Sequence, residues 1–241
     1  RFGRKKVLIF AGLLFTVSAI GTALSQTFSF FVWARIVGGV GIGLASSVSP
    51  MYIAEIAPAR HRGSLVSINQ LTIVVGILAA QITNWLIAEP VPADASSEAI
   101  LFSWNGQYGW RWMFGAETLP AFFFFVLAWF IPESPRWLIK QNLIDDAKKV
   151  LKNIGGSEYA DSELNAVKET LQNETDKVHI SELWKPSLLP ILALGIGLAV
   201  FQQWCGINVI FNYAEEVFTS AGYTITDMFF NIVITGSVNL I

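Results

Sequence analysis

Long apolar stretches alternate with short polar segments along this chain. A bilayer core about 30 Å thick is crossed by about 20 apolar residues in a helix. Only helices or closed barrels satisfy backbone polar groups in lipid, and uninterrupted apolar runs indicate helices. The pattern therefore predicts an all-α membrane protein with six spans, the last of them cut by the chain end: Val7–Ser25, Phe28–Ile56, Leu65–Ala88, Trp112–Ile131, Leu189–Phe211 and about Met228–Ile241.

The basic residues orient these spans. Of the 16 Lys and Arg residues, all but Arg35 and Arg111 precede the first stretch, follow the second or follow the fourth. Excess Lys and Arg marks the cytoplasmic side. We therefore expect residues 1–6, 57–64 and 132–187 to be cytoplasmic, in an integral, multi-pass protein of the plasma membrane, which is the inner membrane in bacteria. The missing initial Met and the apolar end predict a piece of a longer protein.

A polar segment divides the chain into three predicted domains: residues 1–131 with four spans, 132–186, and 187–241 with two. Within the middle segment, apolar residues recur at helical spacing from Leu143 to Ile154, where Gly155-Gly156 ends the pattern. A second helix is expected from about Ser157 to Asn173, and a short third element around Trp184. A flexible linker, the alternative, is typically rich in Gly and Ser and lacks apolar faces.

Carboxamide side chains line the predicted third and fifth spans. Steps of seven, four and three residues place four positions of the third span on one helical face. Amides both donate and accept hydrogen bonds, as hydroxyls do, which suits an uncharged ligand with many hydroxyls. The alternative is that these amides bond neighbouring helices. The two sets are Gln70, Ile77, Gln81 and Asn84, and then Gln202, Gln203, Asn208, Asn212 and Tyr213 around a helix break predicted at Gly206.

Arg35 and Glu117 are the charges inside the spans. Both spans enter from outside, and each charge lies roughly 10 Å in at 1.5 Å per residue. Equal depth favours a pair or a shared network. Ionisable residues inside a membrane mark proton or substrate pathways by default. A static ion pair, or a Glu117 that faces a wet outer vestibule, is the alternative.

Charges also gather where the spans meet the cytoplasm. Glu55 and Glu133 each stand near an Arg on this side, and ion pairs there would hold the cytoplasmic side shut; ordinary solvated charges are the alternative. The residues are Arg4, Lys5, Lys6, Glu55, Arg60, Arg62, Glu133 and Arg136.

Other chemistry finds little support in the sequence. Gly38, Gly39, Gly41 and Gly43 lie inside an apolar helix and predict close helix packing, not nucleotide binding. His61 and His179 lack metal-ligand spacing. We expect no enzyme, no cofactor, no metal and no nucleic-acid partner, and no obligate protein partner is evident.

The motifs resemble the sugar porter family of the major facilitator superfamily, and within it the bacterial D-xylose–proton symporters. The resemblance covers nearly the whole chain and rests on RFGRKK, RIVGGVGIGLASSVSPMYIAEIAPARHRG, INQ, GWRWMF, PESPRWLI and FQQWCGIN. It implies a partial major facilitator fold, transmembrane helices 3–8 of 12, with an intracellular helical domain.

The resemblance also implies roles for individual residues. Gln70, Gln202, Gln203 and Asn208 match amides that bind sugar hydroxyls. Arg35 matches an Arg that pairs with an upstream Asp in proton-coupled members, and Glu117 matches an acidic position of those members. Arg4, Glu55, Arg62, Glu133 and Arg136 match an inner-gate charge network. Three positions depart from the xylose symporter pattern, so a pentose and a hexose are equally credible: Ile77, Phe211 and Asn212.

The sequence thus predicts a monosaccharide–proton symporter that works by alternating access. The predicted sugar site is Gln70, Ile77, Gln202, Gln203, Asn208, Phe211 and Tyr213, and Arg35 and Glu117 couple the proton. Its partners are a monosaccharide, a proton and membrane lipid. A facilitative uniporter is the nearest alternative, and a sugar sensor that does not transport is a more remote one.

Overall fold

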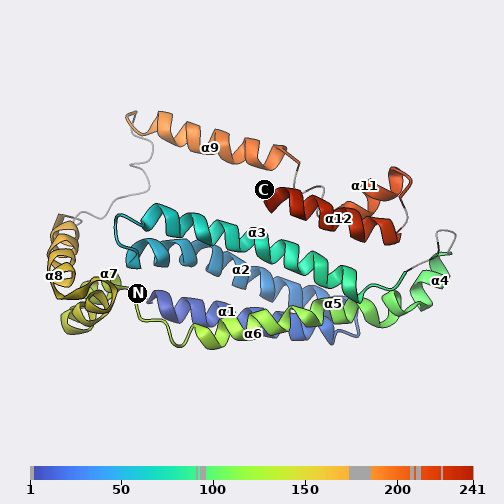
Figure 1. Cartoon of the computed structure of the whole chain (residues 1–241), viewed down its shortest axis with the longest axis horizontal. Helices are drawn as coiled ribbons and strands as arrows, with labels where there is room; N and C mark the ends of the chain where they lie inside the picture. The colour runs from blue at the N-terminus through green and yellow to red at the C-terminus, as the bar shows by residue number, and fades with distance from the viewer. Residues whose placement is uncertain are drawn as a thin grey trace.

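Helices make up the regular structure of the computed structural model, which describes residues 3–90, 92, 96–173, 186–206, 209, 213–223 and 225–240. Among the described residues, three helices are long and apolar enough to cross a membrane: α1 (Arg4–Ala23), α2 (Phe28–Ile56) and α3 (Arg62–Ile87). They lie side by side and alternate in direction (Figure 1). Large apolar side chains cover their outer surface, as lipid contact requires. The first three predicted spans are therefore confirmed to within a few residues.

The fourth predicted span contains a tightened turn in the structure. After α4 (Ser97–Phe102) and a π-helical turn η1 (Asn105–Gly109), the chain forms α5 (Trp110–Ala116) and α6 (Thr118–Leu127). The predicted fourth span Trp112–Ile131 is therefore helical from Trp112 to Leu127 apart from one tightened turn at Glu117, whose backbone stays in the helical region (φ −62°, ψ −22°). Glu117 stands at the junction, where its N–H donates to the carbonyl of Phe114, three residues back, at 3.2 Å. Pro120 then lacks the N–H that would continue the helical ladder.

Two of the four glycines in α2 bring this helix against α1. A Cβ at Gly38 would overlap Ser18 Oγ, and one at Gly41 would lie 3.2 Å from Leu14 Cβ. Among the described residues, nothing lies within 4 Å of a Cβ built at Gly39 or Gly43. Close packing is thus confirmed for Gly38 and Gly41.

The polar middle segment forms a compact helical unit at the end of the bundle where the N-terminus lies (Figure 1). It consists of α7 (Pro135–Lys140) and α8 (Ile144–Asn173), which is broken at Gly156 (φ 86°, ψ −177°). Lys148 and Asp161 pair across this break at 2.5 Å. The two predicted helices are confirmed, and the predicted third element lies outside the described residues. The unit has its own buried core: Leu138, Ile139, Ala147, Leu151, Ala160 and Leu164.

The described residues that follow form the helices α9 (Leu189–Trp204), α11 (Ala214–Ser220) and α12 (Ile225–Leu240). The predicted fifth span is helical as far as Trp204, and its predicted end at Phe211 lies outside the described residues. Gly206 has a φ of 82°, so the helix break predicted at this glycine is confirmed. α12 packs along α3, and the rings of Trp85 and Phe230 meet there at 6.3 Å between centroids.

Candidate functional site

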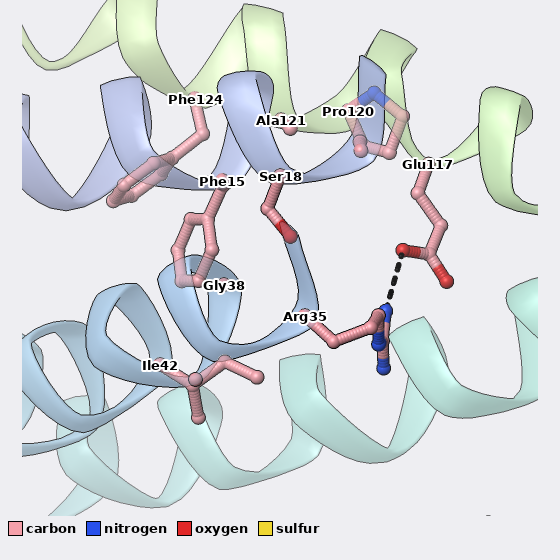
Figure 2. Close-up of a pocket in the computed structure, with 11 residues that line it drawn as sticks. Phe15, Ser18, Arg35, Gly38, Ile42, Glu117, Pro120, Ala121 and Phe124 are labelled. Carbon is pink, nitrogen blue, oxygen red and sulfur yellow. Dashed lines mark ion pairs between the residues drawn. The ribbon is translucent and has the colours of Figure 1, made fainter. Parts of the chain in front are cut away.

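A cavity of about 380 Å³ opens between α1, α2 and α6. Its polar lining consists of Arg35 from α2, Glu117 from the α5–α6 junction and Ser18 from α1 (Figure 2). Aromatic and small residues form the rest of the wall, including Phe15 and Phe124, whose rings lie 6.0 Å apart. Two opposite charges therefore share one cavity in an otherwise apolar part of the bundle.

Arg35 and Glu117 approach each other loosely. Arg35 Nη1 lies 3.8 Å from Glu117 Oε2, and about half of each side chain is exposed, 47% and 50%. The guanidinium also lies over the ring of Phe114, 5.2 Å from its centroid. The pair expected from equal depth is therefore present. A carboxylate that faces a cavity and holds its cation at this distance has room to accept a proton without disrupting a tight hydrogen bond.

A second cluster of charges lies at the end of the bundle where α1 begins and α2 ends. Arg4 of α1 forms a two-point ion pair with Glu55 of α2, with distances of 3.0 Å from Nε to Oε2 and 2.7 Å from Nη2 to Oε1. Ser134 is fully buried and donates its hydroxyl to Glu55 Oε2. Ser134 Oγ also caps α7 by accepting from the N–H of Trp137 at 3.3 Å. These contacts tie α1, α2 and α7 together.

Glu133 binds backbone groups in the same cluster. Its Oε1 accepts from the N–H of Lys5 at 3.1 Å and from the N–H of Ser134 at 3.0 Å. The carboxylate thus lies at the N-terminus of α1, where the helix dipole favours negative charge. Gly3 permits this approach, because a Cβ there would overlap the Glu133 carboxylate.

The predicted inner-gate set is only partly gathered at this cluster. Arg4, Glu55 and Glu133 meet around Ser134, and Arg136 lies in α7. Arg62 instead lies close enough to α8 for its charge to affect Tyr159. Burial raises the pKa of Tyr159 and the charge of Glu163 raises it further, whereas the charge of Arg62 lowers it. Sequence reasoning missed Ser134. The available signal was a Ser directly before a Pro, which is typical of a helix N-cap followed by N1.

The predicted sugar-binding residues do not surround one of these cavities. Gln70 and Ile77 are exposed on α3, Gln202 is exposed near the end of α9, and Tyr213 is 57% exposed. The cavities lined by described residues have volumes of about 280 to 410 Å³, and none of them has Gln70, Ile77, Gln202 or Tyr213 in its lining. Asn208, Phe211, Asn212 and the side chain of Gln203 lie outside the described residues. The sugar site therefore remains a prediction.

Comparisons with known proteins agree on one family. Residues 1–241 match the family described as sugar (and other) transporter. The chain is 40% identical to the glucose transport protein of Synechocystis and 40% identical to the arabinose-proton symporter of Bacillus subtilis. All of this chain is covered in both cases, and 51% and 50% of the relatives. The chain therefore spans about half the length of the curated relatives it matches.

A solved structure gives the same answer for the fold. The partially occluded inward-open conformation of the xylose transporter XylE from E. coli superimposes with a TM-score of 0.80 at 35% identity. The match covers all of this chain and 54% of that one. The fold is thus a partial major facilitator fold in a multi-pass membrane protein, and the chain belongs to the sugar (and other) transporter family.

Proposed function

We propose that the full protein is a monosaccharide–proton symporter that carries a pentose or a hexose by alternating access. The observation that carries this proposal is the loose Arg35–Glu117 pair in a cavity between spanning helices. Structural ion pairs in a low-dielectric interior are stable when tightly hydrogen-bonded. A pair held at 3.8 Å with both side chains half exposed is better suited to a carboxylate that gains and loses a proton.

The proposed organisation has three parts. Residues 1–131 belong to an N-terminal transmembrane lobe, 132–186 form an intracellular helical domain, and 187–241 begin a C-terminal lobe. The sugar site lies between the lobes, where transporters of this kind place substrate. The amides of Gln70, Gln202, Gln203 and Asn208 bind sugar hydroxyls there, with Ile77, Phe211 and Tyr213 as neighbours. The membrane is the plasma membrane, in bacteria the inner membrane.

The cytoplasmic cluster has a proposed role in gating. Arg4, Glu55 and Glu133 hold α1, α2 and α7 in one arrangement, so that the intracellular helices move with the N-terminal lobe. Arg62 and Arg136 complete the proposed inner gate from the ends of α3 and α7. Charged groups that exchange partners between two states supply the bias that alternating access needs.

Uptake by the full-length protein in proteoliposomes tests the function. With the outside one pH unit more acidic, a one-to-one symporter accumulates sugar about tenfold, since one pH unit corresponds to about 1.4 kcal/mol. Xylose, arabinose and glucose are supplied separately, and a protonophore serves as the control. An accumulation ratio near one with every sugar, unchanged by the pH gradient, would refute symport and favour facilitated transport.

A further inference from the structure

α12 crosses α3 in the outer half of the molecule. Gln81 lies six residues before Ile87, the end of α3 opposite the basic cytoplasmic segments, which is about 9 Å at 1.5 Å per residue. Trp85 contacts Phe230 one turn nearer that end. In the proposed organisation α3 belongs to the N-terminal lobe and α12 to the C-terminal lobe. The crossing is therefore a direct contact between the two lobes on the outer side.

Gly236 lets the two helices approach at this crossing. The residue is buried in α12, and a Cβ built on it would overlap Gln81 Oε1. The same Cβ would lie 3.1 Å from Gln81 Cδ and 3.3 Å from Leu78 Cδ1. The carboxamide of Gln81 thus occupies the space that any side chain at position 236 needs.

Among the described residues, no donor reaches the oxygen placed there. Gln81 Oε1 is buried, and none of the described residues donates a hydrogen bond to it. A buried acceptor without a partner carries a desolvation cost that no contact offsets. That cost disappears when α3 and α12 separate and water reaches the oxygen. The closed contact is therefore well packed but carries a penalty that separation relieves.

We propose that Gln81 and Gly236 form an outer contact between the lobes that closes and opens in each transport cycle. Gly236 supplies the clearance that closure requires. The unpaired oxygen of Gln81 keeps the closed contact from becoming too stable to open. This inference rests on the proposed transport function, and it adds two positioning residues that are expected to act without touching the sugar.

Gly236→Val in the full-length protein tests the clearance. Alanine is the weaker probe, because the end of the Gln81 side chain can rotate away from a single methyl group. Gly197→Val on α9 is the matched control, since nothing described lies within 4 Å of a Cβ at Gly197. Closure is needed for sugar counterflow but not for sugar binding by the purified protein. We expect counterflow to fall at least about tenfold in Gly236→Val, with the binding constant for sugar within about twofold of wild type.

Shortening Gln81 should reverse the defect. Gln81→Ala vacates about the volume that valine adds, so Gln81→Ala/Gly236→Val should recover at least half of the counterflow of Gln81→Ala alone. Counterflow in Gly236→Val equal to that in Gly197→Val, a loss of sugar binding, or no recovery in the double variant would each overturn the inference. Absence of counterflow in wild type would refute the proposed function and this inference together.

Gln81→Leu tests the unpaired oxygen. Leucine keeps most of the bulk but removes the buried acceptor, so the thermal midpoint should rise by about 2 °C while counterflow slows. If Gln81 instead held the helices together through hydrogen bonds, the midpoint would fall. A falling midpoint would therefore overturn this half of the inference.

Discussion

Arg4 and Glu55 meet in a two-point ion pair where α1 begins and α2 ends, 51 residues apart in sequence. Glu55 is the more buried partner, with 10% of its side chain exposed against 27% for Arg4. Bidentate pairs between Arg and a carboxylate fix orientation as well as distance. The pair therefore sets how the ends of α1 and α2 sit relative to each other.

A double-mutant cycle on this pair should reveal strong coupling. Arg4→Ala leaves the Glu55 carboxylate partly buried without its cation, so we expect a loss of about 2 kcal/mol of stability. In the Arg4→Ala background, Glu55→Ala should lower the stability by less than it does in the wild-type protein, because the ion pair is already broken. Thermal or denaturant unfolding in detergent gives the coupling energy. Effects that add within about 0.5 kcal/mol would contradict the pairing.

Ser134 has two tasks that substitutions can separate. Ser134→Ala removes both the α7 cap and the donor to Glu55, and should cost about 1–2 kcal/mol. Ser134→Asp keeps a capping oxygen but places a second negative charge against Glu55. We expect Asp to be more destabilising than Ala in unfolding experiments at neutral pH. The opposite order would mean that the cap matters and the Glu55 contact does not.

Glu117→Gln should separate sugar movement from proton coupling. The amide keeps the shape of the side chain and cannot carry the proton. We expect proton-driven accumulation to disappear and sugar counterflow, which needs no net proton movement, to persist. Accumulation should then no longer vary with the pH gradient.

Glu89→Gln is the control for Glu117→Gln, because it changes an exposed carboxyl just beyond the end of α3. Its accumulation should match wild type. Accumulation by Glu117→Gln at the wild-type level would show that Glu117 is not the coupling group.

Gly156→Ala should weaken the helical unit of α7 and α8 through the backbone alone. A φ of 86° with a ψ of −177° is a conformation that glycine adopts almost exclusively. Nothing described lies within 4 Å of a Cβ there, so the expected loss of about 1–3 kcal/mol comes from strain and not from a clash. Gly63→Ala in α3 is the control, because it has equal space and lies in a helix. Equal unfolding midpoints for the two variants would contradict this account.

The sequence predicted features that depend on regular helix geometry. The proximity of Arg35 and Glu117 could be predicted from the sequence. The constant rise per residue and the direction that the charge pattern predicts for each span place both residues at the same depth. Gly156 could be recognised as a break because the apolar periodicity stops there. The glycines of α2 predicted close packing against another helix. The sequence did not indicate that Gly38 and Gly41 are the two of the four that face α1.

The features that were missed depend on distant partners or on short elements. The bond from Ser134 to Glu55 joins positions 79 residues apart, and no local pattern identifies such a partner. The tightened turn of the fourth span at Glu117 gave no sign in hydropathy, because both halves are apolar. Pro120 was the available signal, since it removes one backbone donor near the start of α6.

The anchor that Glu133 provides relies on main-chain donors, which every residue except proline supplies. Lys5 can therefore change identity without loss of the bond from its N–H. Gly3 has no such freedom, since any side chain there meets the carboxylate. Variation among natural versions of this segment should therefore be broad at position 5 and narrow at position 3.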